Sequence, residues 1–305
     1  MDPARFCSQS RLVIVAGKGG VGKTTVTAAL SLMAARAGLK TLIVEVEGKS
    51  GLSTAFAAGD LGYDEIDLAS GVRARTLTPD QALLEYLEDH GMRRLSKRLS
   101  SSGVLDVVST AVPGIKDILV LGKMKQLERE GLADLIVLDA PAAGHAVTFL
   151  TSAKGLLDAV RVGPVRRQAE EVQDLLTDPA RCQVLLVTLP EETPVNEAVE
   201  TAARLRDKVG IQLSAIAVNG LYPAVDGLTT DPAQLQGASA EEADALRKAA
   251  AFRSARQQLQ EQQVARLDAQ LDLPQLHLPF LFSPELGPAD VDDLAGALET
   301  AVAAL

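Results

Sequence analysis

Nine consecutive residues near the start of the chain have the types and spacing that bind phosphate. They read Gly17, Lys18, Gly19, Gly20, Val21, Gly22, Lys23, Thr24 and Thr25, and the first eight fit the pattern G-x-x-x-x-G-K-[ST]. In such a loop, backbone N–H groups at a helix N-terminus meet the phosphate charges, and glycines let the backbone close around them. We expect Lys23 to bridge the outer phosphates of a polyphosphate and the Thr24 hydroxyl to ligate Mg²⁺.

The segments on either side of this loop support the same interpretation. The apolar run Leu12–Ala16 before it is typical of a buried parallel strand. The segment Thr24–Arg36 after it, rich in alanine and leucine, predicts a helix that ends near Gly38. The alternative, a glycine-rich turn with an unrelated lysine, does not account for a strand, a loop and a helix in register.

A second buried strand ends in a carboxylate. The run Leu135–Leu138 is apolar and is followed by Asp139. A residue at the C-terminal end of such a strand points into the crevice where an α/β sheet binds its ligand. Asp139 therefore occupies the Walker B position and is expected to hold Mg²⁺ together with Thr24. The alternative role for Asp139 is a cap on the helix that follows.

The composition limits the class of protein. The chain has 305 residues, 47% of them hydrophobic, and a net charge of −10, so we expect no nucleic-acid partner. No apolar run approaches the ~18–20 residues that span a bilayer, and Met1–Arg11 lacks a signal-peptide core, so no stable membrane insertion is expected. The two cysteines, Cys7 and Cys182, form no CxxC pair, which favours a reduced, cytoplasmic protein.

Strand and helix patterns alternate along the chain. This alternation predicts an α/β fold with a doubly wound, mostly parallel sheet. The predicted strands are Leu12–Ala16, Thr41–Val46, Val72–Leu77, Leu135–Leu138, Gln183–Val187, Ala215–Val218 and Gln275–Leu278.

Two stretches, about 79–128 and 147–178, are helical without intervening strands, and we expect them to form a small helical lobe inserted in a single domain, 1–305. Breaks are predicted at Pro113-Gly114 and Gly163-Pro164. The loop Tyr222–Ser239 should precede a long exposed helix that begins with a capping box at Ser239 and ends near Leu271.

Lys18 adds a finer signal to the glycine loop. With this lysine, the loop resembles the "deviant" KGGxGK[ST] loop of the MinD, ParA, nitrogenase-reductase and ArsA-like ATPases, which are P-loop NTPases. The resemblance implies ATP and ADP as ligands and a dimer in which Lys18 reaches the partner's nucleotide, where it would stabilise charge that develops on the phosphates. The alternative is a solvated loop lysine.

The segment that follows the strand Leu135–Leu138 resembles a motif of one of these families. Asp139 to Leu150 is similar to the switch II pattern DxxPTGHTLRxL of the ArsA-like ATPases, which include the arsenite-pump ATPases and the tail-anchored-protein targeting factors. Asp139, Gly144, His145 and Leu150 match, whereas the proline lies one place early, at Pro141. The resemblance implies a hinge loop that responds to the γ-phosphate. Taken alone, His145 would be a helix-start or core histidine.

Weaker matches follow further along the chain. Ala111–Asp117 resembles the family's PGxxE helix start, and Val187–Pro194 resembles the segment after its next strand. The resemblance implies that Asn219 reads the adenine edge and that the backbone at Pro279 and Phe280 flanks the base. Asn219 before Gly220 is otherwise a plausible turn residue.

The chain also departs from the family. Alignment places Glu47 at the switch I aspartate that positions the attacking water, and a longer side chain implies an adjusted geometry or slow hydrolysis, because a displacement of about 1 Å costs ~100-fold. Two separated cysteines cannot form an arsenite site of three thiolates, and without a CxxC motif no structural zinc is expected. Only four methionines are present, which disfavours a methionine-rich groove for membrane helices.

These observations predict a cytosolic, Mg²⁺-dependent ATPase of the ArsA-like class that acts as a dimer and couples nucleotide state to a helical lobe that binds a client or partner. The client is not indicated by any residue. A first alternative is a nucleotide-gated scaffold subunit with weak hydrolysis, paired with a paralogous chain. A second is a MinD- or ParA-type positioning ATPase, although the C-terminal helix lacks the Lys and Arg of a membrane-binding helix.

Overall fold

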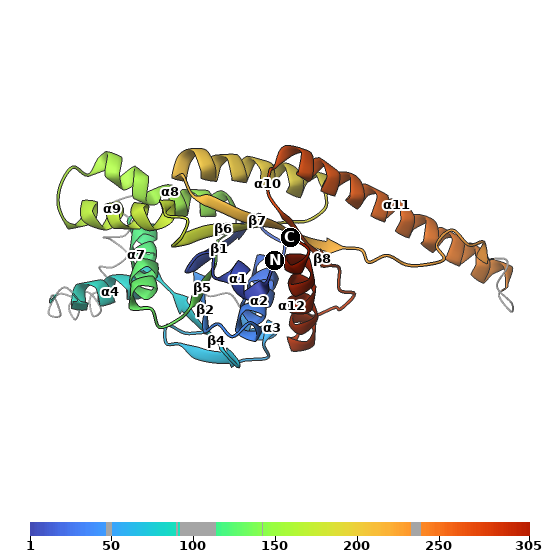
Figure 1. The fold of residues 1–305 in the computed structure, drawn as a ribbon, viewed down its shortest axis with the longest axis horizontal. Coiled ribbons are helices and arrows are strands. Elements are labelled where there is room, and N and C mark those ends of the chain that lie inside the picture. Colours follow the sequence, from blue (N-terminus) through green and yellow to red (C-terminus); the bar gives the residue numbers. More distant parts are fainter. Residues whose placement is uncertain (47–50, 90, 92–113, 142, 233–238) are drawn as a thin grey trace.

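Among the residues that the structure describes, eight strands form one sheet with helices on both of its faces (Figure 1). The computed structural model describes residues 1–46, 51–89, 91, 114–141, 143–232 and 239–305. The strands are β1 (Leu12–Gly17), β2 (Thr41–Val46), β3 (Ile66–Ala69), β4 (Val72–Leu77), β5 (Leu135–Asp139), β6 (Cys182–Thr188), β7 (Gln212–Leu221) and β8 (Gln275–Pro279). Their order is β3-β4-β2-β5-β1-β6-β7-β8, and every pair is parallel except β3 with β4. The predicted doubly wound α/β sheet is confirmed.

The central strands are buried on both faces. All of β2 and β5 is buried, as is nearly all of β1 and β6, which explains why their sequences are mostly apolar. All seven predicted strands are present. The structure adds β3, an edge strand of four residues whose side chains are half-buried or exposed, so its sequence lacks the apolar run that marks the others.

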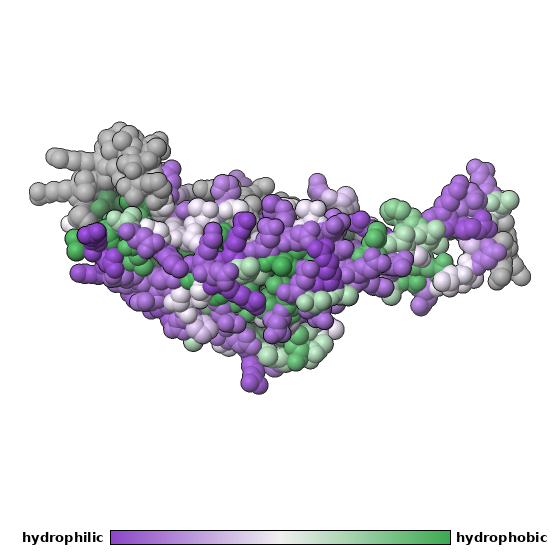
Figure 2. Space-filling view, turned by 90° about the horizontal axis from the view of Figure 1, so that it is seen from above, coloured by the Kyte–Doolittle hydropathy of each residue, from purple (hydrophilic) through white to green (hydrophobic). Residues whose placement is uncertain are grey.

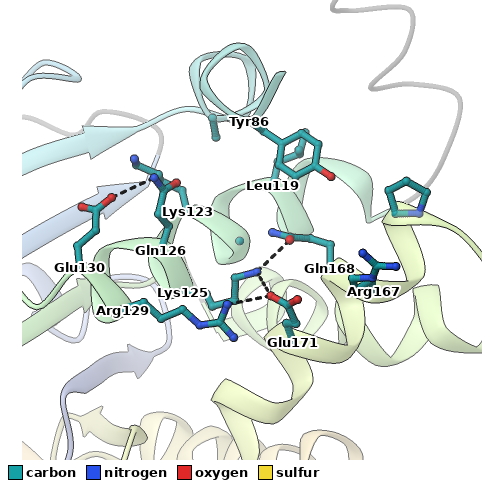
Figure 3. Close-up of a pocket in the computed structure, with 13 residues that line it drawn as sticks. Tyr86, Leu119, Lys123, Lys125, Gln126, Arg129, Glu130, Arg167, Gln168 and Glu171 are labelled. Atoms are coloured by element: carbon teal, nitrogen blue, oxygen red, sulfur yellow. Dashed lines mark hydrogen bonds and ion pairs between the residues drawn. The ribbon is translucent and has the colours of Figure 1, made fainter. Parts of the chain in front are cut away.

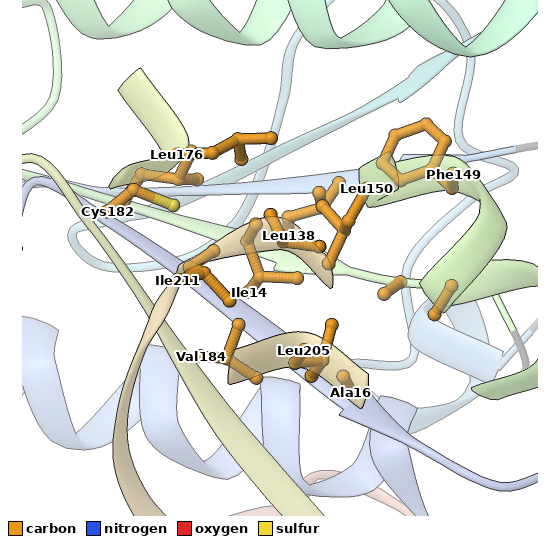
Figure 4. Close-up of a cluster of buried hydrophobic side chains, with 14 of the residues drawn as sticks. Ile14, Ala16, Leu138, Phe149, Leu150, Leu176, Cys182, Val184, Leu205 and Ile211 are labelled. Atoms are coloured by element: carbon orange, nitrogen blue, oxygen red, sulfur yellow. The ribbon is translucent and has the colours of Figure 1, made fainter. Parts of the chain in front are cut away.

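Two layers of helices cover the sheet. One face carries α1 (Pro3–Cys7), α2 (Lys23–Arg36), α3 (Gly51–Ala55) and α12 (Pro288–Ala303). The other carries α7 (Ile115–Glu130), α8 (Ala143–Ala159), α9 (Pro164–Thr177), α10 (Glu192–Arg204) and the π-helical turn η1 (Leu205–Val209). Figure 4 shows part of the core on this second face, where Ile14 and Leu138 of the sheet lie among Leu150, Leu176 and Leu205.

The two stretches expected to form a helical lobe contain α4 (Pro79–Asp89), α7, α8 and α9. These helices gather at one end of the molecule, farthest from α11 (Figure 1). The predicted break at Gly163-Pro164 is confirmed, since α8 ends at Ala159 and Gly163 caps α9. Helix α7 begins after Gly114, and Pro113 lies outside the described residues. Because α7 to α9 also bury side chains against the sheet, a separate lobe remains a prediction.

The long helix is present as α11 (Ala240–Gln270), and its predicted capping box is formed by Ser239 and Glu242. At 31 residues it is roughly 46 Å long. Its first half projects beyond the rest of the molecule beside the segment that follows β7 (Figure 1). None of the helices in the described ranges has the length and apolar character to cross a membrane.

Candidate functional site

The glycine loop connects β1 to α2, and a hydrogen bond links its two ends. Gly20 and Gly22 have φ angles of 84° and 90°, a backbone region that glycine adopts without strain. The ammonium of Lys23 turns back over the loop and donates to the carbonyl of Lys18 at 3.0 Å. Gly22 caps α2 and has no side chain to bond the first helical N–H groups, so these N–H groups point toward the loop. The arrangement suits an anion held at a helix N-terminus.

Two glycines of the loop are required by their neighbours. A Cβ on Gly17 would lie 2.3 Å from the carbonyl oxygen of Val187 in β6. A Cβ on Gly22 would lie 2.2 Å from Nδ2 of Asn219, at the end of β7. The sequence predicted that glycines clear space for phosphate; the structure shows that these two also clear space for adjacent strands.

Thr24 and Asp139 meet at the head of α2. The Thr24 hydroxyl donates to Oδ2 of Asp139 at 2.7 Å, and Asp139 is fully buried. The parallel register of β1 and β5 pairs Val15 with Asp139, so the carboxylate lies at the edge where β1 becomes the loop. A hydroxyl and a carboxylate are hard oxygen ligands, and this pair fits the coordination of Mg²⁺.

A third polar residue at this edge, Glu45 of β2, was not identified by the sequence analysis. Glu45 is aligned with Asp139 in the β2–β5 pair, and its carboxylate is fully buried. Neighbouring residues in a parallel pair point to the same face, so both carboxylates lie on the face covered by α2. Thr76 of β4 donates to Glu45 at 3.4 Å. A charged residue inside an apolar strand was the signal that could have identified it.

Switch I is only partly described. Glu47, which the alignment placed at the water-positioning carboxylate, lies outside the described residues. The segment resumes at Gly51, where a Cβ would lie 2.9 Å from Cγ2 of Thr24. The chain after β2 therefore returns to the residue that faces Asp139.

Lys18 forms an ion pair within its own chain. Its ammonium lies 2.7 Å from the carboxylate of Glu197 on α10. Both side chains are partly exposed, so the pair is weak, with a stabilisation of about 0–1 kcal/mol. Lys18 is thus held near the loop by a contact that costs little to break.

The residues that were expected to contact the adenine base of the nucleotide lie near one another beside the loop. Asn219 donates through Nδ2 to the carbonyl of Val21 at 3.0 Å, which joins the end of β7 to the glycine loop. Phe280, directly after Pro279 at the end of β8, donates its N–H to the carbonyl of Leu221 at 2.7 Å. The structure therefore brings Asn219, Pro279 and Phe280 to the same edge as the loop.

One side chain of α11 fixes this edge. Gln260 accepts a hydrogen bond from the N–H of Tyr222 at 2.9 Å and donates to the carbonyl of Gly220 at 3.0 Å. It is 4% exposed, on a helix that is otherwise mostly exposed. Gln260 was not identified from the sequence, because it is one of several glutamines in a polar helix and no pattern sets it apart.

The switch II residues follow Asp139. Pro141 is half-buried, and Gly144 and His145 lie exposed in the first turn of α8. This segment was expected to be a loop, whereas the described residues from Ala143 onward are helical. The Thr148 hydroxyl donates to the carbonyl of Gly144 at 3.2 Å, which supports that first turn.

A cavity of about 530 Å³ lies away from the glycine loop, between α4, α7 and α9 (Figure 3). Lys125 reaches Glu171 at 2.5 Å and Gln168 at 3.0 Å, and Arg129 also bonds Glu171. The hydrogen bond from Lys125 lowers the pKa of Glu171. Gly122 leaves room for Gln168, whose Nε2 lies 1.9 Å from where a Cβ would be. Polar side chains therefore line a hollow between the helices expected to form the lobe.

Comparison with known proteins identifies the family. Residues 10–161 match the family model described as anion-transporting ATPase. The chain is 35% identical over 255 residues to ATPase BagA of Mycobacterium tuberculosis, covering 80% of this chain and 73% of the relative. It is 29% identical over 218 residues to the arsenical pump-driving ATPase of Escherichia coli, covering 70% of this chain and 35% of the relative. The chain belongs to the ArsA-like ATPase family.

The two cysteines of this ArsA-like ATPase lie in different cores. Cys7 packs on the α2 face of the sheet and Cys182 on the α8 face, so their thiols do not converge. Burial raises the pKa of Cys7 to about 12 and also raises that of Cys182. Both thiols are therefore protonated near neutral pH, whereas a soft metalloid would require thiolates.

Gly22→Ala should weaken nucleotide binding by roughly tenfold or more, because the new methyl group collides with Asn219 and the residue is held at positive φ. Isothermal titration calorimetry measures the affinity. Gly20→Ala is the matched control, since it has a similar φ but open space around its Cβ position. Equal losses in the two variants would contradict a role for the Gly22–Asn219 contact.

Asp139→Asn should remove most of the Mg²⁺ dependence of nucleotide affinity, because an amide is a poorer ligand than a carboxylate for a hard cation. Titrations with and without Mg²⁺ measure this difference. Asp134→Asn, before the opposite end of β5, is the control and should keep the dependence. An unchanged Mg²⁺ effect in Asp139→Asn would exclude Asp139 as a ligand.

Proposed function

We propose that this chain is a Mg²⁺-dependent ATP-binding and ATP-hydrolysing switch that works as a dimer. The observation that supports this most directly is the contact between Thr24 and Asp139 at the head of α2, beside a glycine loop closed by Lys23. Membership of the ArsA-like ATPases supports the same function.

The residues in and around the loop have separate proposed roles. Lys23 and the N–H groups at the start of α2 hold the phosphates, and Thr24 and Asp139 hold Mg²⁺. When bound, Mg²⁺ offsets the charge that develops on the β- and γ-phosphate oxygens. Asn219 and the backbone at Pro279 and Phe280 contact the base.

The attacking water needs a carboxylate to position it. Glu47 is the residue aligned with the family's aspartate, and we propose that it positions the water. Glu45 is buried on the neighbouring strand in register with Asp139, and its carboxylate accepts a hydrogen bond from Thr76.

Coupling to the rest of the molecule would follow the two segments that border Thr24 and Asp139. Gly51 contacts Thr24 and leads into α3, while Asp139 leads through Pro141 into α8. A shift of α8 would displace side chains of α7 and α9, because the three helices pack in one hydrophobic core. We propose that the cavity between α4, α7 and α9 lies on the surface that responds to nucleotide and meets a client or partner.

A second candidate function is a nucleotide-gated scaffold with weak hydrolysis, paired with a paralogous chain. Glutamate at position 47 favours it. Phosphate release by the purified chain alone argues against it. A MinD-type membrane role has less support, because α12 buries Val291, Leu294, Leu298 and Val302 in the core and so has no free apolar face.

Lys23→Ala should reduce ATP turnover by at least ~100-fold, because the phosphate charge loses its buried cation. Phosphate release at saturating Mg²⁺ and ATP measures turnover. Lys40→Ala, an exposed lysine at the opposite end of β2, should retain the rate. Wild-type hydrolysis by Lys23→Ala would reject the assignment of the loop.

Mixing two inactive variants tests whether Lys18 acts in trans. Lys18→Ala keeps Lys23 and needs a partner's Lys18, which Lys23→Ala still supplies. We expect each variant alone to be nearly inactive and the mixture to recover part of the wild-type turnover per chain. A mixture no more active than its components would place Lys18 in its own subunit's site.

Glu47→Gln should slow turnover with little change in ATP affinity, because the amide still fills the space but cannot accept a proton from the water. Comparison of single-turnover rates and calorimetric affinities separates the two effects. A rate equal to that of the wild type would remove Glu47 from the mechanism.

A further inference from the structure

Large hydrophobic side chains gather on one projecting part of the molecule. We call residues 223–232 and 240–259 the arm. Of the eleven large hydrophobic residues exposed in the described ranges, six lie on the arm or at its base: Val225, Leu246, Phe252, Leu259, Phe280 and Phe282. Figure 2 shows hydrophobic residues on the arm, between its hydrophilic tip and the body. Contiguous exposed apolar surface of this kind marks an interaction site.

The arm has a groove. Between the helix and the preceding segment lies a hollow of about 530 Å³, lined on the helix side by Leu246, Ala249 and Ala250. Val225 and Leu228 line it on the other side. The small alanines leave space that a large apolar side chain from outside could fill.

The arm also has a protruding stripe. Ala245, Phe252, Ala255 and Leu259 are all exposed and follow one another at intervals of seven, three and four residues. This spacing places them on one face of α11 and is the spacing at which helices pack against other helices. Phe252 is 69% exposed and does not line the groove of its own arm.

Several bonds hold the two segments of the arm together, both at its base and nearer its tip. Arg253 and Gln257 both donate to the carbonyl of Pro223, and Arg247 pairs with Asp231 at 3.3 Å. Gln260 joins the helix to the end of β7 beside Asn219. A surface fixed in this way loses little conformational entropy when a partner binds.

The arm begins at the edge of the sheet that carries the glycine loop. Strands β1, β6 and β7 are parallel, so the end of β7 and the end of β1 lie at the same edge. A second copy that approaches this edge, as the proposed dimer requires, meets the base of the arm.

Charge favours a second copy as the partner. The chain carries a net charge of −10, so two copies repel one another over most of their surface. Helix α11 contains five acidic and five basic residues and is neutral. Like-charged copies can approach along this helix without the repulsion that applies elsewhere.

We propose that the arm packs against the arm of a second copy of this chain, with Phe252 of each copy in the groove of the other. Each arm carries both a protruding side chain and a groove, so two copies can make the same contact twice, as two-fold symmetry requires. The inference rests on the proposed function, because it identifies the surface through which the proposed dimer is held.

The test compares the dimer dissociation constants of Phe252→Ser and wild type by sedimentation in Mg²⁺ and ATP. A central aromatic side chain commonly dominates an interface, so we expect dimerisation to weaken at least ~10-fold. Val162→Ser is the matched control, since Val162 is 83% exposed and lies between α8 and α9, away from the arm. It should leave the constant unchanged.

A cross-linking experiment tests whether position 252 of one copy lies next to the groove of the other. The native thiols Cys7 and Cys182 are buried, so cysteines introduced on the arm react selectively. A mixture of Ala249→Cys and Phe252→Cys chains should form disulfide-linked pairs faster than either variant alone.

The outcomes separate the two proposals. Wild-type chains that stay monomeric with Mg²⁺ and ATP contradict the proposed dimer itself. A nucleotide-dependent dimer that is equally tight in Phe252→Ser overturns the arm contact alone. Weakening by Val162→Ser to the same extent also overturns it, because the effect would then be unrelated to the arm.

Discussion

The register between β1 and β5 is the constraint on which the candidate site depends. Pairing of Val15 with Asp139 places a buried carboxylate at the point where β1 turns into the glycine loop, and the first turn of α2 then brings the Thr24 hydroxyl to it. A shift of one residue in a parallel pair would turn Asp139 to the opposite face, toward the α8 core. Apolar side chains on both faces of these strands fix the register, so the packing of the core also determines the site.

The sequence predicted the structure best where a pattern of residue types is compatible with few local structures. The glycine loop, the buried strands and the capping box at Ser239 could all be predicted, because few alternatives satisfy the same pattern. The edge strand β3 was missed because its exposed side chains leave no apolar run. Glu45 and Gln260 were missed for a different reason, since their roles depend on neighbours that are distant in sequence and are brought together only by the sheet.

Hydrogen bonds of Asn219 and Gln260 connect the glycine loop to the projecting helix α11. Asn219 is bonded to the glycine loop through Val21, and Gln260 is bonded to the backbone on either side of Leu221. The loop, the end of β7 and the base of α11 are therefore connected by hydrogen bonds in a single series. The projecting helix is built onto the same edge as the proposed nucleotide site, which is the structural basis for relating nucleotide binding to association of chains.

The most direct measurement of the central claim is calorimetric titration of the wild-type chain with ATP in the presence and absence of Mg²⁺. We expect one nucleotide to bind per chain, with an affinity that falls when Mg²⁺ is removed, because Thr24 and Asp139 are the proposed ligands of the cation. The absence of any binding at saturating Mg²⁺ and ATP would contradict a nucleotide site at this loop.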